Sequence, residues 1–165
     1  WMQWRIENSG WKNEKEWVLN LMRSDNPYLA AAAISSAQKI AGKEAEDVLC
    51  EIIGNNDVRA NVRAEAIYAI TEDARPEVLL ALVNVLDVNT PCHSEEDNLY
   101  MYESYPFYEH PAVRLMSETM ENWYAEKDKS ITLGSEVEKR LRELTKKDFG
   151  KDGRAWRKWI ERHVK

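Results

Sequence analysis

The chain has 165 residues, of which 44% are hydrophobic and 32% are charged, a composition that predicts a folded globular domain rather than a disordered segment. Its formal net charge of −6 disfavours a nucleic acid as the main partner, because neutralising phosphates requires a basic surface. No apolar run approaches the ~18–20 residues that a transmembrane helix needs, so we expect no membrane span.

The first elements in chain order are short helices with clear end signals. Asn13 to Glu16 resembles a capping box that opens a helix with Trp17 on its core face. Asn26 and Pro27 supply an N-cap and a proline at the first helical position of the next helix, which Gly42 ends. Residues 43–53 then place a set of apolar side chains on one face, namely Ala45, Val48, Leu49, Ile52 and Ile53.

A second pair of helices follows the same plan. Residues 54–57 (Gly-Asn-Asn-Asp) break the chain and recap it, so that we expect a helix over residues 58–71. Arg75 and Pro76 start the next helix. Residues 78–86 are apolar on nearly every side, which is typical of a helix buried between neighbours.

Residues 58–70 echo a segment 33 residues upstream. The offset aligns Ala33 with Ala66 and Ile34 with Ile67, and it aligns Leu29 with Val62. A fixed offset in the range of about 30–45 residues is the signature of stacked helical hairpins.

Residues 88–110 interrupt this rhythm. His110-Pro111 reopens a helix, and Val113-Arg114 repeats Val62-Arg63 after 51 residues, so that the surplus over the repeat measures an insertion. Ser135 and Glu138 are then expected to cap a helix with an apolar face, and a last short helix follows it. The apolar residues of these two helices are Val137, Leu141, Leu144, Trp156, Trp159 and Ile160.

The Val62-Arg63-Ala64 and Val113-Arg114 motifs resemble the HEAT-like (PBS-lyase-type) helical-repeat family, in which Val-Arg near the start of the first helix precedes small residues and a turn. The C-terminal pattern of residues 144–159 is similar to a Trp-rich ending seen on some bacterial HEAT-like proteins. The resemblance implies a structural cap at this end more than an active site.

Together these patterns predict an all-α fold, an alpha-alpha superhelix (HEAT-like solenoid) of about three helical hairpins with one long inserted loop. We expect one domain over residues 1–165. Its parts are repeats at 27–54, 58–87 and 111–145, an insertion at 88–110 and a C-terminal cap at 146–165.

The insertion is the strongest candidate for function, because long loops in compact domains are often binding elements. It mixes aromatic residues, which are common at interface hot spots, with acidic residues that favour a basic partner. An alternative is that the aromatic side chains cover the apolar surface of the stack itself. The candidate contacts are Glu95, Glu96, Tyr100, Tyr102, Glu103, Tyr105, Phe107 and Tyr108.

Catalytic and metal sites have less support. Cys92, His93, Glu95, Glu96 and His110 offer ligand types, but no spacing typical of a metal site accompanies them. Cys92 beside His93 has no context typical of a nucleophile. We therefore predict a non-enzymatic scaffold that binds a protein or peptide, without a cofactor.

A nucleic-acid-binding alternative rests on the C-terminal segment. Residues 134–165 carry a net charge of +5, against −5 for residues 1–88 and −6 for residues 89–133. Trp156 and Trp159 could stack on bases, and HEAT-like folds include DNA glycosylases. The acidic residues Glu44, Asp47 and Glu51 on one helix face argue against this role.

The compartment and the oligomeric state stay open. Cys50 and Cys92 allow one disulfide, or two separate thiols with Cys50 as a small apolar side chain of its helix. The protein is cytoplasmic, or exported if a signal peptide preceded Trp1 and was removed.

Overall fold

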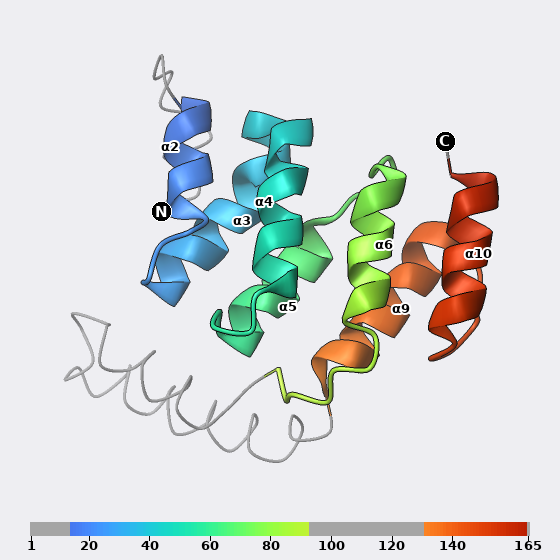
Figure 1. Ribbon diagram of the computed structural model, residues 1–165. Helices are drawn as coiled ribbons and strands as arrows, with labels where there is room; N and C mark the ends of the chain where they lie inside the picture. The colour runs from blue at the N-terminus through green and yellow to red at the C-terminus, as the bar shows by residue number, and fades with distance from the viewer. Residues whose placement is uncertain (1–13, 93–130, 165) are drawn as a thin grey trace, which may run out of the picture.

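The regular secondary structure in the described part of the chain is helical. The computed structural model describes residues 14–92 and 131–164, which hold seven α-helices and no named β-strand. The expected all-α class is therefore confirmed for these ranges (Figure 1). The helices are α2 (Glu14–Leu21), α3 (Pro27–Ala41), α4 (Lys43–Gly54), α5 (Ala60–Ala69), α6 (Pro76–Asn84), α9 (Leu133–Thr145) and α10 (Gly153–His163).

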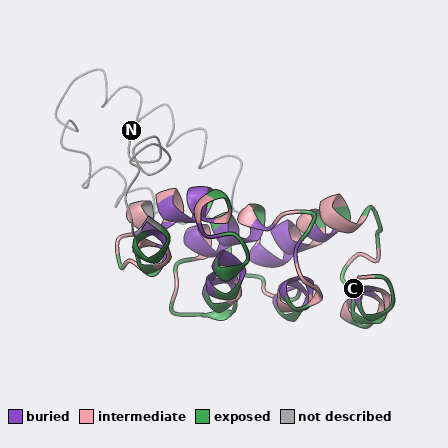
Figure 2. Ribbon diagram, turned by 90° about the horizontal axis from the view of Figure 1, so that it is seen from above, coloured by how far each residue is buried: buried purple, intermediate pink, exposed green. Residues whose placement is uncertain are grey.

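These helices lie in two rows. Helices α2, α4, α6 and α10 form one row, and α3, α5 and α9 form the other (Figures 1 and 2). Along the second row, α3 packs on α5 and α5 packs on α9. Across the rows, α4 packs on α5 and α9 packs on α6. Both rows contain buried residues, coloured purple in Figure 2.

Several helix ends follow the end signals in the sequence. Asn26 Oδ1 accepts a hydrogen bond from the backbone N–H of Leu29 at 3.3 Å, and Pro27 is the first residue of α3. Gly42, with φ of 56°, follows the end of α3 in the left-handed region that glycine adopts at low cost. Arg75 is the N-cap of α6 and Pro76 its first residue, as predicted.

Two predicted caps are wrong. Helix α9 begins before Ser135, because Thr132 and Ser135 form a reciprocal capping box in which Ser135 is the third helical residue. Asp57 does not cap α5, which begins at Ala60 after Arg59 without a side-chain cap. Arg63 instead fixes this connection from within α5.

The repeated positions lie in the core. Ala33 and Ile34 of α3, like Ala66 and Ile67 of α5, are at most 1% exposed. The Thr71 hydroxyl also donates to Gln38 Oε1 at 3.2 Å, and these two residues are again 33 positions apart. The repeated positions are therefore buried in both helices, and one equivalent pair, Gln38 of α3 and Thr71 just after α5, is in direct contact.

The predicted place of Trp17 in the core is wrong. Its side chain is 38% exposed, whereas Val18 and Met22 of the same region are at most 1% exposed. The buried side of this region is therefore set by Val18 of α2 and by Met22 just after it, and α2 packs on α3. The larger apolar surface of Trp17 therefore did not decide whether it or Val18 faces the core.

Residues 88–92 run antiparallel to residues 131–134. The Cys92 N–H donates to the Ile131 carbonyl at 3.0 Å, the Leu133 N–H to Thr90 at 3.0 Å, and the Gly134 N–H to Val88 at 2.8 Å. A Cβ on Gly134 would lie 2.3 Å from the Leu86 carbonyl oxygen, so that this close approach requires glycine. The two ends of segment 93–130 are therefore held side by side.

Cys50 and Cys92 are not joined by a disulfide. Cys92 is 1% exposed and belongs to the core, while Cys50 is half-buried on α4. Burial, followed by the nearby Asp47 carboxylate, raises the pKa of the Cys50 thiol. The disulfide alternative is absent from this structure.

Candidate functional site

The eight contact residues predicted in the insertion lie outside the described residues, since all of them fall within 93–130. The same holds for Val113-Arg114 and for most of the ligand types considered for a metal. The first residues of the predicted insertion, 88–92, are described, and they form the base at which segment 93–130 leaves the helices. The site must therefore be sought on the described helices.

The acidic face of α4 is compensated by cations from its two neighbours. Lys15 of α2 pairs with Glu44, and Arg75 at the start of α6 pairs with Asp47 at 2.5 Å. Arg75 also reaches Glu46, which is buried, at 2.6 Å. These hydrogen bonds raise the pKa of the Arg75 guanidinium above its usual range.

The third compensated carboxylate belongs to Glu51. The Arg23 guanidinium donates through Nε and Nη2 to Glu51, and Nη2 lies 2.6 Å from Oε2. This contact lowers the pKa of the Glu51 carboxyl below its ordinary value. The acidic residues that argued against an anionic partner are therefore each paired with a cation, which offsets their negative charge locally.

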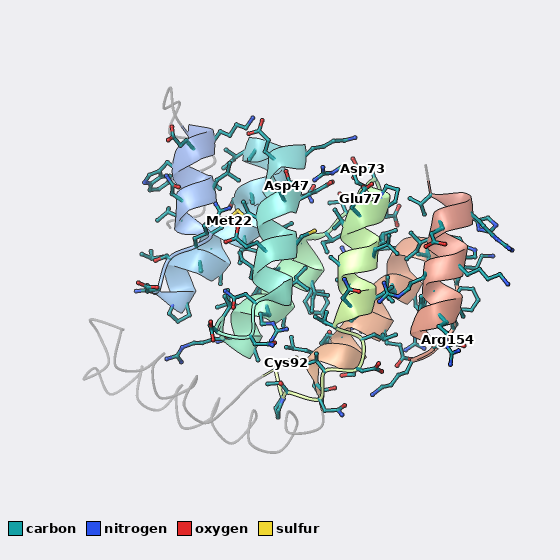
Figure 3. All side chains as sticks on the ribbon, viewed as in Figure 1. Met22, Asp47, Asp73, Glu77, Cys92 and Arg154 are labelled. Atoms are coloured by element: carbon teal, nitrogen blue, oxygen red, sulfur yellow. The ribbon has the colours of Figure 1, made fainter. Side chains whose placement is uncertain are left out.

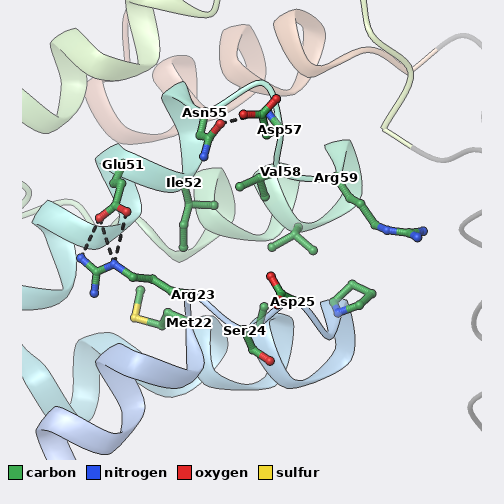
Figure 4. A pocket seen from close by; sticks show the side chains of 13 residues that line it. Met22, Arg23, Ser24, Asp25, Glu51, Ile52, Asn55, Asp57, Val58 and Arg59 are labelled. Atoms are coloured by element: carbon green, nitrogen blue, oxygen red, sulfur yellow. Dashed lines mark hydrogen bonds and ion pairs between the residues drawn. The ribbon is translucent and has the colours of Figure 1, made fainter.

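A pocket of about 330 Å³ opens beside this ion pair, between two turns of the chain (Figure 4). One wall is the α2–α3 turn and the other is the α4–α5 turn. Its apolar surface is built by Met22, Pro27, Ala30, Ile52, Val58 and Val62, most of which are buried. The volume lies at the lower end of the range, about 300–1,000 Å³, of small-molecule pockets.

Two carboxylates flank the opening, one from each wall. Asp25 and Asp57 are exposed, and their side chains make no hydrogen bond or ion pair within the described part of the chain. Figure 4 shows the Arg59 guanidinium directed away from the cavity. Because Arg23 is already engaged by Glu51, the rim of the pocket is acidic.

Local hydrogen bonds fix both walls. On one side, the Asn26 N–H donates to Ser24 Oγ at 3.2 Å. On the other, the Asp57 N–H donates to Asn55 Oδ1 at 2.9 Å, a turn that asparagine favours. The backbone that carries Asp25 and Asp57 is therefore held in place on each side.

Arg63 supports the second wall from beneath. Its side chain is 3% exposed, its Nε donates to the Ile53 carbonyl at 3.0 Å, and its Nη1 donates to Asn56 Oδ1 at 3.2 Å. Burial lowers the pKa of this guanidinium. Arg63 therefore ties the α4–α5 turn to the start of α5 and gives the predicted Val-Arg motif a structural role.

The two C-terminal tryptophans have different environments. Trp156 is fully buried, its Nε1 donates to the Gly150 carbonyl at 2.9 Å, and its ring meets Phe149 edge-on at 4.9 Å. Trp159 is half-buried, with its ring stacked on His163 at 5.0 Å. Trp156 is therefore part of the core and does not stack on a base.

The basic residues of this segment fall into two groups. The first group contacts other side chains. Its pairs are Lys139 with Tyr68, Arg140 with Glu143, Arg142 with both Glu138 and Asp148, Lys146 with Glu72, and Arg157 with Asn84. A second group has no side-chain ion pair or hydrogen bond within the described residues. It consists of Lys147, Lys151, Arg154, Lys158 and Arg162.

No group of three or more His, Cys, Asp or Glu residues within the described ranges is arranged to hold a metal ion. No helix in those ranges is both long enough and apolar enough to cross a bilayer. Comparison of the chain with protein-family models, with curated proteins and with solved structures found no match.

Proposed function

We propose that this protein is a non-enzymatic, HEAT-like scaffold that binds a basic segment of a protein or peptide. The repeat assignment is supported by the 33-residue offset and by its burial pattern. It is also supported by the packing of α9 on α5 and of α10 on α6, because a further helical pair of a superhelix would extend both rows in this way. The predicted unit at 111–145 falls largely outside the described residues and stays a prediction.

The observation that carries the binding proposal is the pocket between the α2–α3 and α4–α5 turns. It combines an apolar floor, including Met22, Ile52 and Val62, with the unpaired carboxylates of Asp25 and Asp57. A lysine or arginine side chain fits both halves, because its aliphatic stem covers apolar surface while its cation stays near water. A neighbouring apolar residue of the partner would fill the remaining space.

The arrangement suits binding better than catalysis. Asp25 and Asp57 are exposed, whereas a carboxylate acting as general base near neutral pH needs burial or a close like charge to raise its pKa. Glu51, the other carboxylate among the residues that line the pocket, is held as an anion by Arg23. The partner-contact residues predicted in the insertion are proposed as a second contact surface for the same partner.

A peptide-library selection on the immobilised protein tests this proposal. We expect the retained peptides to be enriched in arginine or lysine next to an apolar residue, and their retention to weaken as salt rises, because rim charges are screened. Selection of acidic peptides, or no enrichment at all, would overturn the assignment of the pocket to a basic segment.

A further inference from the structure

We propose that the outer face of α10 is a second docking surface, which binds an acidic segment of a protein. This surface consists of Arg154, Lys158 and Arg162, and it is separate from the pocket near α2 and α4. Figure 3 shows Arg154 on α10, at the opposite end of the molecule from Met22. The proposal does not depend on the pocket, so either one can fail without the other.

The three cations form one row that is inclined to the helix axis. They recur every four residues, on the side of α10 opposite Trp156 and Ile160, which are fully buried. At a rise of 1.5 Å per residue, neighbouring members of the row are about 6 Å apart along the helix axis. All three are exposed, and two further unpaired cations, Lys147 and Lys151, precede the helix.

This spacing matches acidic side chains on a polypeptide. Glutamates four residues apart on a partner helix repeat at about 6 Å. Alternate residues of an extended strand repeat at about 6.6–6.8 Å. A partner in either conformation can place one carboxylate against each cation of the row.

A nucleic acid fits the same surface less well. Single-strand binding normally combines a basic groove with open aromatic rings on which bases stack. Here Trp156 is buried and hydrogen-bonded, and the Trp159 ring is half-buried against His163.

Other basic residues nearby, unlike those of the row, make contacts that hold the fold together. Arg157 donates to Asn84 at 2.7 Å and thereby joins α10 to α6. Lys146, just after α9, pairs with Glu72, which lies between α5 and α6. Arg154, Lys158 and Arg162 have no such structural task, so that removing their charges should leave the fold intact.

Fluorescence anisotropy of the full chain with a labelled oligoglutamate peptide tests the proposal. We expect binding at about 50 mM salt that weakens markedly by about 200 mM, as for contacts made by exposed charges. The Arg154→Gln, Lys158→Gln double variant should bind at least about tenfold more weakly, while Arg154→Lys should bind as the native protein does.

A control variant, Lys43→Gln with Asn89→Asp, lowers the net charge by the same amount at exposed positions away from α10. It should retain binding, and circular dichroism should show an unchanged helix content for both doubles. Equal losses in the two doubles, or no binding by the native chain, would overturn the proposal. Tighter binding of an oligothymidine strand than of oligoglutamate would assign the surface to nucleic acid instead.

Discussion

Arg23 and Glu51 join α2 to α4 through a two-pronged ion pair, with Arg23 Nε and Nη2 lying 3.0 and 2.6 Å from Glu51 Oε2. The pair forms part of the wall of the pocket, so that Arg23, one of the two arginines that line it, is already engaged. As a result, the carboxylates of Asp25 and Asp57 are left to attract a cation from outside.

The ion pair predicts a contribution of Glu51 to stability that depends on pH. Arg23 lowers the pKa of Glu51 in the folded state, so the stabilisation is complete above the unfolded value, near 4.5, and disappears as the pH falls through the lower folded value. Urea unfolding should show that Glu51→Gln loses less stability than the native protein between neutral and acidic pH. The difference should stay below about 1 kcal/mol, because the pair is exposed to solvent. Glu65→Gln, which removes an exposed carboxylate that has no partner among residues 14–92 and 131–164, should follow the native curve; a divergence of the same size would contradict the assignment.

Arg63→Lys should weaken the α4–α5 turn. Lysine keeps the charge but cannot donate from two separate nitrogens to the Ile53 carbonyl and to Asn56. We expect the free energy of unfolding to fall by about 1.5–3 kcal/mol, the range for hydrogen bonds to charged groups. Chemical denaturation measures it, and hydrogen exchange should show faster opening around residues 55–59. Native-like exchange there would show that the turn does not depend on Arg63.

Gly134→Ala should destabilise the base of segment 93–130. The added methyl group would meet the Leu86 and Val88 carbonyl oxygens at 2.3 and 3.0 Å, and backbone atoms cannot move aside cheaply. We expect a loss of unfolding free energy of about 1–3 kcal/mol, typical of overpacking.

Gly54→Ala is the matched control, because nothing lies within 4 Å of its new methyl group. It should be neutral or stabilising by up to about 1 kcal/mol. Equal thermal stability of the two variants would refute the close approach.

Trp156→Ala should cost about 3–5 kcal/mol of unfolding free energy, since it removes a fully buried ring. Trp159→Ala should cost clearly less, because that ring is half-buried. Thermal denaturation compares the two. A larger effect at Trp159 would mean that the C-terminal helix is packed differently from the arrangement described.

Local signals in the sequence predicted much of the fold. Asn26-Pro27, Gly42 and Arg75-Pro76 mark real helix ends, because capping and the restrictions on proline and glycine act within a few residues. The prediction for Trp17 failed because the choice of buried face depends on the neighbouring helix α3. The cap at Ser135 was displaced because Thr132 competes for the same role.

The pocket could not be predicted in the same way. Asp25 and Asp57 come from turns on different helical pairs, and only packing brings the two turns together. The pairing of the acidic residues on α4 also depends on packing. Glu51 is neutralised by Arg23, which lies 28 residues upstream, and a composition count cannot reveal such a pair. One signal in the sequence could have indicated these pairs. A cation lies 28 or 29 residues from each paired acidic residue of α4, as in Lys15–Glu44 and Arg75–Asp47.

Binding of a basic segment through Asp25 and Asp57 is tested most directly by the affinity of a labelled oligoarginine peptide for three forms of the protein. We expect the Asp25→Asn, Asp57→Asn double variant to bind at least about tenfold more weakly than the native protein. We expect the control Glu65→Gln, Asp87→Asn, which changes the net charge equally at exposed positions outside the pocket, to keep the native affinity. Equal affinity of all three forms, or the same loss in both doubles, would contradict it.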